Sequence, residues 1–408
     1  MRKKPVPSST LANIAMSELM SSSPLSGNAS FSSEWYVLLE CASPAHDPPR
    51  LTGLLGSVDW DRLLVVAEEH GVTGHLAARI REVAEALVPQ EIRQALIDRQ
   101  RAQILSSLRL TAELFRLLEL FTAEGIGALV VKGPVLAMQA YGDPAIRNYG
   151  DLDLLVQQRD ILRATELMSA GGYVAAVSLS AIDAGKIPGQ YLFSKLDSKL
   201  IVELHNDCTL RYFPRRLPIE EFFARQIRVR LDGHDAPALS VEDELVLICI
   251  HGAKHFWERL MWIADVAALV IRQTGIDWER VADSARAVGA ERMLHTGLRL
   301  ASDLLQARLP DKVQAAVRAD TAATRLAEQA RKWLSAAGYA PPALFERAMF
   351  RLRMRGGLVA APAYLLRLSF SPTEEDWRDG PEANRHWLFG ALCRPIRLAR
   401  KYGRGGKT

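Results

Sequence analysis

The stretch that decides the fold is "VVKGPVLAMQAYGDPAIRNYGDLDLLV", residues 130–156. It begins inside the apolar run "IGALVVKG", residues 126–133, a pattern typical of a central β-strand. Proline is well tolerated in the first turn of a helix, so Pro134 predicts a short helix over residues 134–142, closed by a glycine. The run "LDLLV" predicts a second strand. We therefore expect a sheet with helices packed on it.

Two aspartates one residue apart lie at the start of that second strand. Side chains alternate across a strand, so Asp151 and Asp153 face the same way while Leu152 and Leu154 face the core. At about 6 Å and an effective dielectric of about 20, two carboxylates repel by roughly 3 kcal/mol. This is comparable to what one buried leucine contributes, so a positive charge should offset it, and a divalent cation is the natural candidate.

A third acid is predicted to lie in a neighbouring strand. The segments "GQYLFSK" and "KLIVELH" flank turn residues and predict a β-hairpin. In the second of these, Glu203 shares a face with Ile201 and His205. If this strand lies beside the one carrying Asp151 and Asp153, three carboxylates meet in one cleft.

The rest of the chain is predicted to be helical. Apolar residues recur every three or four positions before residue 122 and again after residue 236. Ser240 with Asp243 predicts a helix start. The expected fold class is α+β. The expected organisation is a disordered Ser-rich leader (1–34), an N-terminal helical region (35–122), a small mixed-sheet core (123–235), a C-terminal helical domain (236–395) and a basic flexible tail (396–408).

Composition limits the class of protein further. Of 408 residues, 49% are hydrophobic and 24% charged, which is typical of a globular protein with sizeable cores. The net charge of +4 mildly disfavours long nucleic acid as a partner. The four cysteines form no CxxC pair, which favours a reducing compartment, and no apolar run approaches the roughly 20 residues of a membrane span. The expected location is the cytoplasm.

Several residues together carry a resemblance to a known family. They are Lys132, Gly133, Arg147, Gly150, Asp151, Asp153, Glu203, Leu204 and His205. In this order and context the sequence resembles the uncharacterised branch of the DNA-polymerase-β-like nucleotidyltransferase superfamily. The resemblance extends over roughly residues 35–405, because the helical segments after residue 239 are also similar to that branch.

The resemblance implies a fold, a reaction and a set of site residues. The core would be a polymerase-β-like nucleotidyltransferase that moves a nucleoside monophosphate from a nucleoside triphosphate, with ATP the expected nucleotide, to an unknown acceptor. Pyrophosphate would leave. A small molecule, peptide or protein is the favoured acceptor. The implied catalytic and metal-binding residues, holding two Mg²⁺ with Mn²⁺ as the alternative, are Asp151, Asp153 and Glu203. The implied nucleotide-binding residues are Lys132, Gly133, Arg147 and Gly150.

Four further residues are candidates for lining the cleft. His205 shares the face of Glu203, and the resemblance extends over the helix that carries His251, Lys254 and His255. The spacing of the last two histidines would suit a metal. The segment "HGAKH" nevertheless lacks the glutamate that a zinc-protease helix carries after its first histidine, so zinc hydrolysis is not expected.

Other interpretations stay open at this point. The superfamily usually has Gly-Gly or Gly-Ser shortly before the acids, whereas here Pro134 follows Gly133 and 17 residues separate Gly133 from Asp151. Since proline removes a backbone donor, a catalytically degenerate, nucleotide-binding adaptor acting through its helices is the alternative. A peripheral membrane protein using "GGLVAAPAYLLRLSF" and the basic tail is a third reading. Lys132 and Arg147 are equally placed to form ion pairs with nearby aspartates.

Overall fold

The fold is known from a computed structural model. It describes residues 32–334 and 343–355, apart from residues 84, 178, 180, 181, 183–188, 196–199 and 208–216. Most of the predicted leader, the basic tail and the apolar stretch at 356–370 lie outside the described residues. Among the helices that are described, none combines the length and the apolar character needed to span a bilayer.

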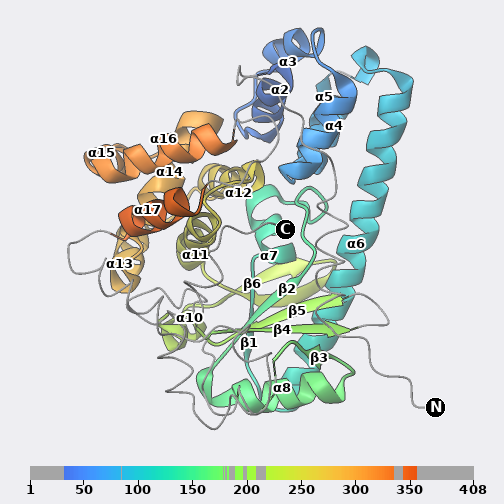
Figure 1. Cartoon of the computed structure of the whole chain (residues 1–408). Helices are drawn as coiled ribbons and strands as arrows, with labels where there is room; N and C mark the ends of the chain where they lie inside the picture. The colour runs from blue at the N-terminus through green and yellow to red at the C-terminus, as the bar shows by residue number, and fades with distance from the viewer. Residues whose placement is uncertain are drawn as a thin grey trace, which may run out of the picture.

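A seven-stranded mixed sheet forms the centre of the molecule, with helices around it, which confirms the predicted α+β class (Figure 1). Its strand order is β3-β4-β5-β2-β1-β7-β6. The strands are β1 (Ala128–Val131), β2 (Leu152–Val156), β3 (Val174–Ala175), β4 (Gln190–Lys195), β5 (Leu200–His205), β6 (Ile227–Leu231) and β7 (His234–Ala238).

The strand, helix and strand predicted from the opening stretch are all present. Between β1 and β2 lies helix α7 (Gly133–Tyr141), which ends at Gly142 with a φ of 74°, a backbone conformation that favours glycine. Strands β1 and β2 are antiparallel, and the predicted β4–β5 hairpin is formed. The β6–β7 hairpin was not predicted. Its second strand, "HDAPA", contains a proline and little apolar alternation, and it crosses the predicted boundary at residue 235.

Alternate residues of β2 face opposite cores. Leu152 and Leu154 pack on one side of the sheet against helices α6 (Gln90–Ala123) and α8 (Ile161–Ala170). Leu155 packs on the other side, in a cluster with Phe222 of helix α10 (Ile219–Ala224) and Leu247 of helix α11 (Val241–Lys254). By the two-residue repeat of a strand, Asp153 faces this second side. The acids therefore lie on the face covered by α11.

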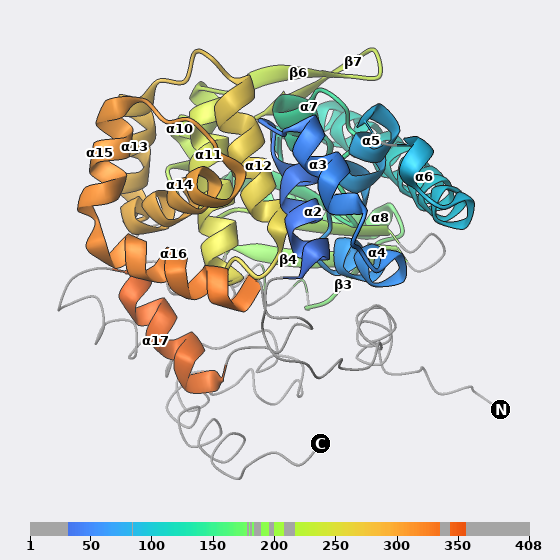
Figure 2. The same cartoon turned by 90° about the horizontal axis from the view of Figure 1, so that it is seen from above.

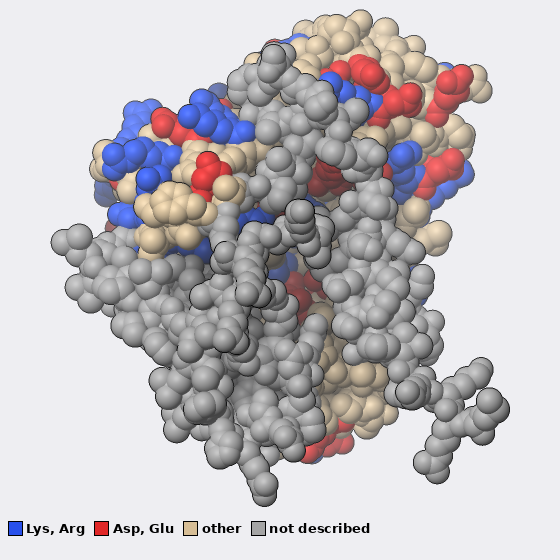
Figure 3. Space-filling model, in the orientation of Figure 1, with Lys and Arg blue, Asp and Glu red and all other residues tan. Residues whose placement is uncertain are grey.

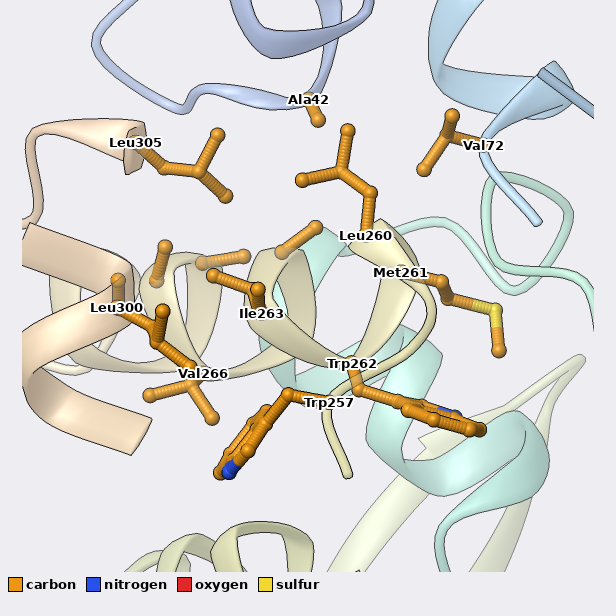
Figure 4. Close-up of a cluster of buried hydrophobic side chains, with 14 of the residues drawn as sticks. Ala42, Val72, Trp257, Leu260, Met261, Trp262, Ile263, Val266, Leu300 and Leu305 are labelled. Carbon is orange, nitrogen blue, oxygen red and sulfur yellow. The ribbon is translucent and has the colours of Figure 1, made fainter. Parts of the chain in front are cut away.

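The helical regions on either side of the core share one hydrophobic cluster. In Figure 4, Ala42 and Val72 from the N-terminal region lie opposite Leu260 and Met261 from the C-terminal region. Figure 2 shows α2 beside α12. The N-terminal helices are α2 (Ser33–Ala42), α3 (Pro48–Leu55), α4 (Trp60–Glu69) and α5 (Thr73–Val83). The C-terminal helices after α11 are α12 (Leu260–Arg272), α13 (Trp278–Val288), α14 (Glu291–Leu305), α15 (Asp311–Ala319), α16 (Thr321–Leu334) and α17 (Leu344–Met354).

The turn between α11 and α12 has an unusual backbone. Phe256 and Trp257 have φ values of 59° and 57°, in the left-handed region that side chains rarely adopt. Trp257 is fully buried, and it lies so close to Gly252 and Gly297 that a Cβ at either glycine would meet its ring at 2.4 or 2.7 Å. Close packing of the indole against two glycines thus accompanies the strained turn.

Both signs of charge are interspersed over the described helices visible in Figure 3. This matches the small net charge of +4.

Candidate active site

Asp153 and Glu203 lie opposite each other on neighbouring central strands. Strands β2 and β5 are parallel, and their register pairs Asp153 with Glu203 and Leu155 with His205. On β2's other side, Asp153 pairs with Val131 of β1. The predicted adjacency of the two acidic strands is therefore confirmed. Because both strands are central, their backbones hold the two carboxylates on a rigid support.

Lys132 and His205 bind the two oxygens of Asp153. Lys132 Nζ lies 2.9 Å from Oδ2, and His205 Nε2 lies 2.7 Å from Oδ1. His205 Nε2 is also 3.5 Å from Glu203 Oε2. The Asp153 side chain is only 4% exposed, whereas those of Glu203 and His205 are 19% and 15% exposed. Positive charge beside Asp153 therefore comes from Lys132 and, when it is protonated, from His205.

The pKa values follow from this arrangement. Burial raises the pKa of Asp153, but Lys132 and His205 outweigh it and hold that pKa well below its usual value. Burial lowers the pKa of His205, and its bonds to Asp153 and Glu203 more than reverse the effect. Burial and the two other carboxylates raise the pKa of Asp151 to about 6. The two aspartates are therefore unequal, since the cations beside Asp153 favour its ionised form while burial and the neighbouring carboxylates disfavour that form in Asp151.

Asp151 lies just before β2, at the mouth of the same site. It is half-buried, and its backbone carbonyl is 4.0 Å from the position a Cβ would take on Gly133, whose φ is 50°. Gly150 has open space around its Cα. Asp151 thus stands between the strand that carries Asp153 and the first turn of α7.

The backbone of Lys132 is held in a left-handed conformation by a buried glutamate. Lys132 has a φ of 57° and immediately precedes α7, whose first turn contains Pro134. Its N–H donates to Oε1 of Glu244 at 3.1 Å. Glu244 is 1% exposed, its Oε2 has no hydrogen-bond partner among the described residues, and burial raises its pKa to about 7. Glu244 therefore supports the turn that directs the Lys132 ammonium to Asp153.

Arg147 is engaged by a carboxylate from helix α12. Its Nε lies 3.0 and 2.9 Å from the two oxygens of Asp265, and the Tyr141 hydroxyl donates to Asp265 Oδ1 at 3.0 Å. The side chains of Arg147 and Asp265 are 5% and 2% exposed. This buried network ties the loop before Asp151 to the C-terminal helices.

The end of α11 brings the other predicted residues to the site. Lys132 Nζ lies 3.4 Å from His251 Nδ1, and an ammonium has only donors, so the ring nitrogen accepts. His251 and His255 contact each other and Trp262, with ring centroids 4.7 to 5.4 Å apart. Lys254 Nζ donates to Oε1 of Gln190 at 3.4 Å. His251 therefore connects α11 to the acidic centre through Lys132, and Lys254 connects α11 to β4.

Two site residues were missed by the sequence analysis. Asp265 interrupts an otherwise apolar helix, and such a lone buried charge is a signal that a partner exists. Glu244 lies in the first turn of α11, where acids are common because they favour the positive end of the helix dipole. Nothing local distinguishes it from an ordinary first-turn acid, since its contact with Lys132 spans 112 residues.

One group of described residues has the geometry to hold a metal ion. Ligand atoms of Asp153, Glu203 and His205 all lie within 4.8 Å of one another. The two carboxylates suit Mg²⁺, which prefers oxygen ligands, while the imidazole suits transition ions. Asp151 does not belong to this group, although it is close enough to Asp153 and Glu203 to be raised in pKa by them.

The fold and its acidic centre are consistent with the nucleotidyltransferase class of α+β proteins. A family model described as uncharacterised nucleotidyltransferase matches residues 56–306, which is more than half of the chain. The chain therefore belongs to this uncharacterised nucleotidyltransferase family, as the sequence resemblance indicated. Comparison with curated proteins finds no significant match. Family membership supports a general role in nucleotidyl transfer.

Proposed function

We propose that this protein is a metal-dependent nucleotidyltransferase that moves a nucleoside monophosphate from a nucleoside triphosphate, with ATP the first candidate, to an acceptor molecule. The observation that carries the proposal is the pairing in register of Asp153 and Glu203 on neighbouring strands, with Lys132 within 2.9 Å of Asp153. Family membership supports the same reaction class. Pyrophosphate would be the second product.

The acids and the residues around them have distinct roles in this proposal. Asp153 and Glu203, with Asp151 two residues before Asp153, would hold a divalent ion, Mg²⁺ or Mn²⁺. When bound, the ion would neutralise charge on the triphosphate and lower the pKa of the acceptor hydroxyl. The backbone amides at Gly133 and the start of α7 would bind phosphate oxygens, with Gly150 leaving room beside them.

Two basic residues have different roles in the proposed nucleotide site: Lys132 would bind phosphate, and Arg147 would position the loop before Asp151. Lys132 would exchange part of its contact with Asp153 for a phosphate oxygen, because an ammonium has three donors. Arg147 would act through its ion pair with Asp265, which fixes the loop leading to Asp151. The half-buried His251, Lys254 and His255 would line the acceptor side of the site.

The test is a search for the reaction and its product. Purified protein is incubated with Mg²⁺ and each nucleoside triphosphate, with and without small-molecule extract, and pyrophosphate and new monophosphate adducts are measured by mass spectrometry. Asp153→Ala and Glu203→Gln should abolish adduct formation. Asp235→Asn, which removes an exposed acid 54% accessible on β7, should leave it unchanged. Absence of pyrophosphate with every nucleotide, together with unchanged nucleotide binding in Asp153→Ala, would contradict the proposal.

A nucleotide-binding adaptor is the second candidate. It is favoured by Pro134 in the first turn of α7, which removes a phosphate donor, and by the occupation of both Asp153 oxygens by Lys132 and His205. Calorimetric titration with ATP separates the two candidates. An enzyme should lose most of its ATP affinity when EDTA removes the metal, whereas an adaptor that binds through cations alone should keep it.

A further inference from the structure

His205 contacts two of the three acids, Asp153 and Glu203. Its Nε2 is 2.7 Å from Asp153 Oδ1 and 3.5 Å from Glu203 Oε2. The two residues of β5 are separated by one position and so share a face, and the parallel register sets that face against Asp153. An imidazole nitrogen is thus held by the same two strands that hold the carboxylates.

Oδ1 of Asp153, Glu203 and His205 together offer a position for an ion. Lys132 occupies Oδ2 of Asp153, so Oδ1 is the oxygen shared with His205. Asp153 is buried, but the half-buried side chains of Glu203 and His205 border its Oδ1 and keep 19% and 15% of their surface accessible. A cation replacing the His205–Asp153 contact would displace the Nε2 proton to solvent and meet Oδ1, a Glu203 oxygen and Nε2 together, while Lys132 keeps its own contact.

We propose that His205 is a metal ligand and that this site prefers a first-row transition ion over Mg²⁺; Mn²⁺, which has the weakest affinity in that series, is the stringent probe of this preference. This inference rests on the proposed metal-dependent function, and it adds which class of ion the site of Asp153 and Glu203 would bind. Mg²⁺ takes oxygen ligands and retains its waters, whereas imidazole nitrogen is a common ligand of transition ions. One nitrogen among two carboxylates therefore shifts the selectivity of the site.

Mn²⁺ itself is the probe, because it is paramagnetic. Wild-type protein is titrated with Mn²⁺, and the electron paramagnetic resonance signal of the free ion gives the affinity. Pulsed electron paramagnetic resonance of the bound ion then reports nitrogen ligands directly. We expect ¹⁴N modulation in wild-type protein, and displacement of Mn²⁺ only by a large excess of Mg²⁺.

Two variants and one control define the ligand. His205→Asp should keep Mn²⁺ binding through oxygens, lose the ¹⁴N modulation and reduce the preference for Mn²⁺ over Mg²⁺ by roughly tenfold. His205→Asn, which has no charge, should also lose the modulation. His234→Asn removes an exposed ring on β7, outside the site, and should retain the modulation. Circular dichroism of each variant checks that the fold is intact.

The inference is overturned if Mn²⁺ binds wild-type protein without ¹⁴N modulation, or if the modulation persists in folded His205→Asp. It is also overturned if wild-type protein does not bind Mn²⁺. These results are separate from the fate of the proposed reaction. Mg²⁺-dependent pyrophosphate release measured on the same preparations would show the nucleotidyltransferase proposal standing while the nitrogen ligand is refuted.

Discussion

The buried pair of Arg147 and Asp265 provides the sharpest test of how the site is supported. The resemblance implied nucleotide binding by Arg147, and the sequence left an ion pair with an aspartate as the alternative; in the structure its guanidinium lies 2.9 Å from the carboxylate of Asp265, which is 2% exposed. Removing one member of a buried ion pair leaves the other charge without a partner, at a cost of about 3–5 kcal/mol. In Asp265→Leu, Tyr141 also loses its acceptor, which adds about 1 kcal/mol.

We expect Arg147→Met to lower the free energy of unfolding by about 3–5 kcal/mol, and Asp265→Leu to lower it by about 4–6 kcal/mol because Tyr141 also loses its acceptor. The double variant should recover at least half of that loss. Burial raises the pKa of Asp265 even though Arg147 opposes the shift, so the pair does not fully offset its own desolvation. Two apolar side chains would avoid that cost.

The assay is equilibrium urea unfolding followed by circular dichroism and tryptophan fluorescence, compared where the two transitions coincide. The control is Asp235→Asn, which breaks an exposed pair with Arg230 and should change stability by no more than about 0.5 kcal/mol. The reasoning fails if either single variant loses less than about 1 kcal/mol. It also fails if Arg147→Met keeps full stability but loses ATP binding, because Arg147 would then contact the nucleotide.

Three further predictions concern other buried groups. His75 has no partner on either ring nitrogen among the described residues, and burial lowers its pKa to about 3. Because its unfolded pKa is near 6.5, the unfolded chain takes up the proton first, and stability falls as the pH drops from about 6.5 toward 3. His75→Phe should remove about 1 kcal/mol per pH unit of that fall in urea titrations at pH 7, 6 and 5. Gly297→Ala would place a Cβ 2.7 Å from Trp257, so unfolding free energy should fall by about 1–3 kcal/mol, and no loss would mean the indole can shift. Glu244→Gln can still accept from the Lys132 N–H and should keep near-normal ATP affinity, whereas Glu244→Leu should weaken it; equal effects in calorimetry would refute a positioning role.

Local pattern was sufficient for the central strands and for the acids. The strands around Asp153 and Glu203 are short apolar runs bounded by turn residues, and a two-residue repeat decides which side chains share a face. Local pattern did not predict β7, because this strand contains a proline and its strand character is evident only from its pairing with β1 and β6. It also left α11 and α12 undivided, since the break depends on Trp257 fitting against Gly297, 40 residues later in the chain.

By itself, the sequence determined the fold class and, through its resemblance, the family. It also determined that Asp153 and Glu203 lie on short strands, because strand periodicity is a local property. Only the tertiary structure decided which charges meet. Asp153 is neutralised by Lys132 and His205, and Arg147 is paired with Asp265 across 118 residues. It also joined the N- and C-terminal helices into one core. The interaction between two charges depends on the distance between them in the folded protein and on the low dielectric of its interior. The number of residues between them in the sequence does not give that distance.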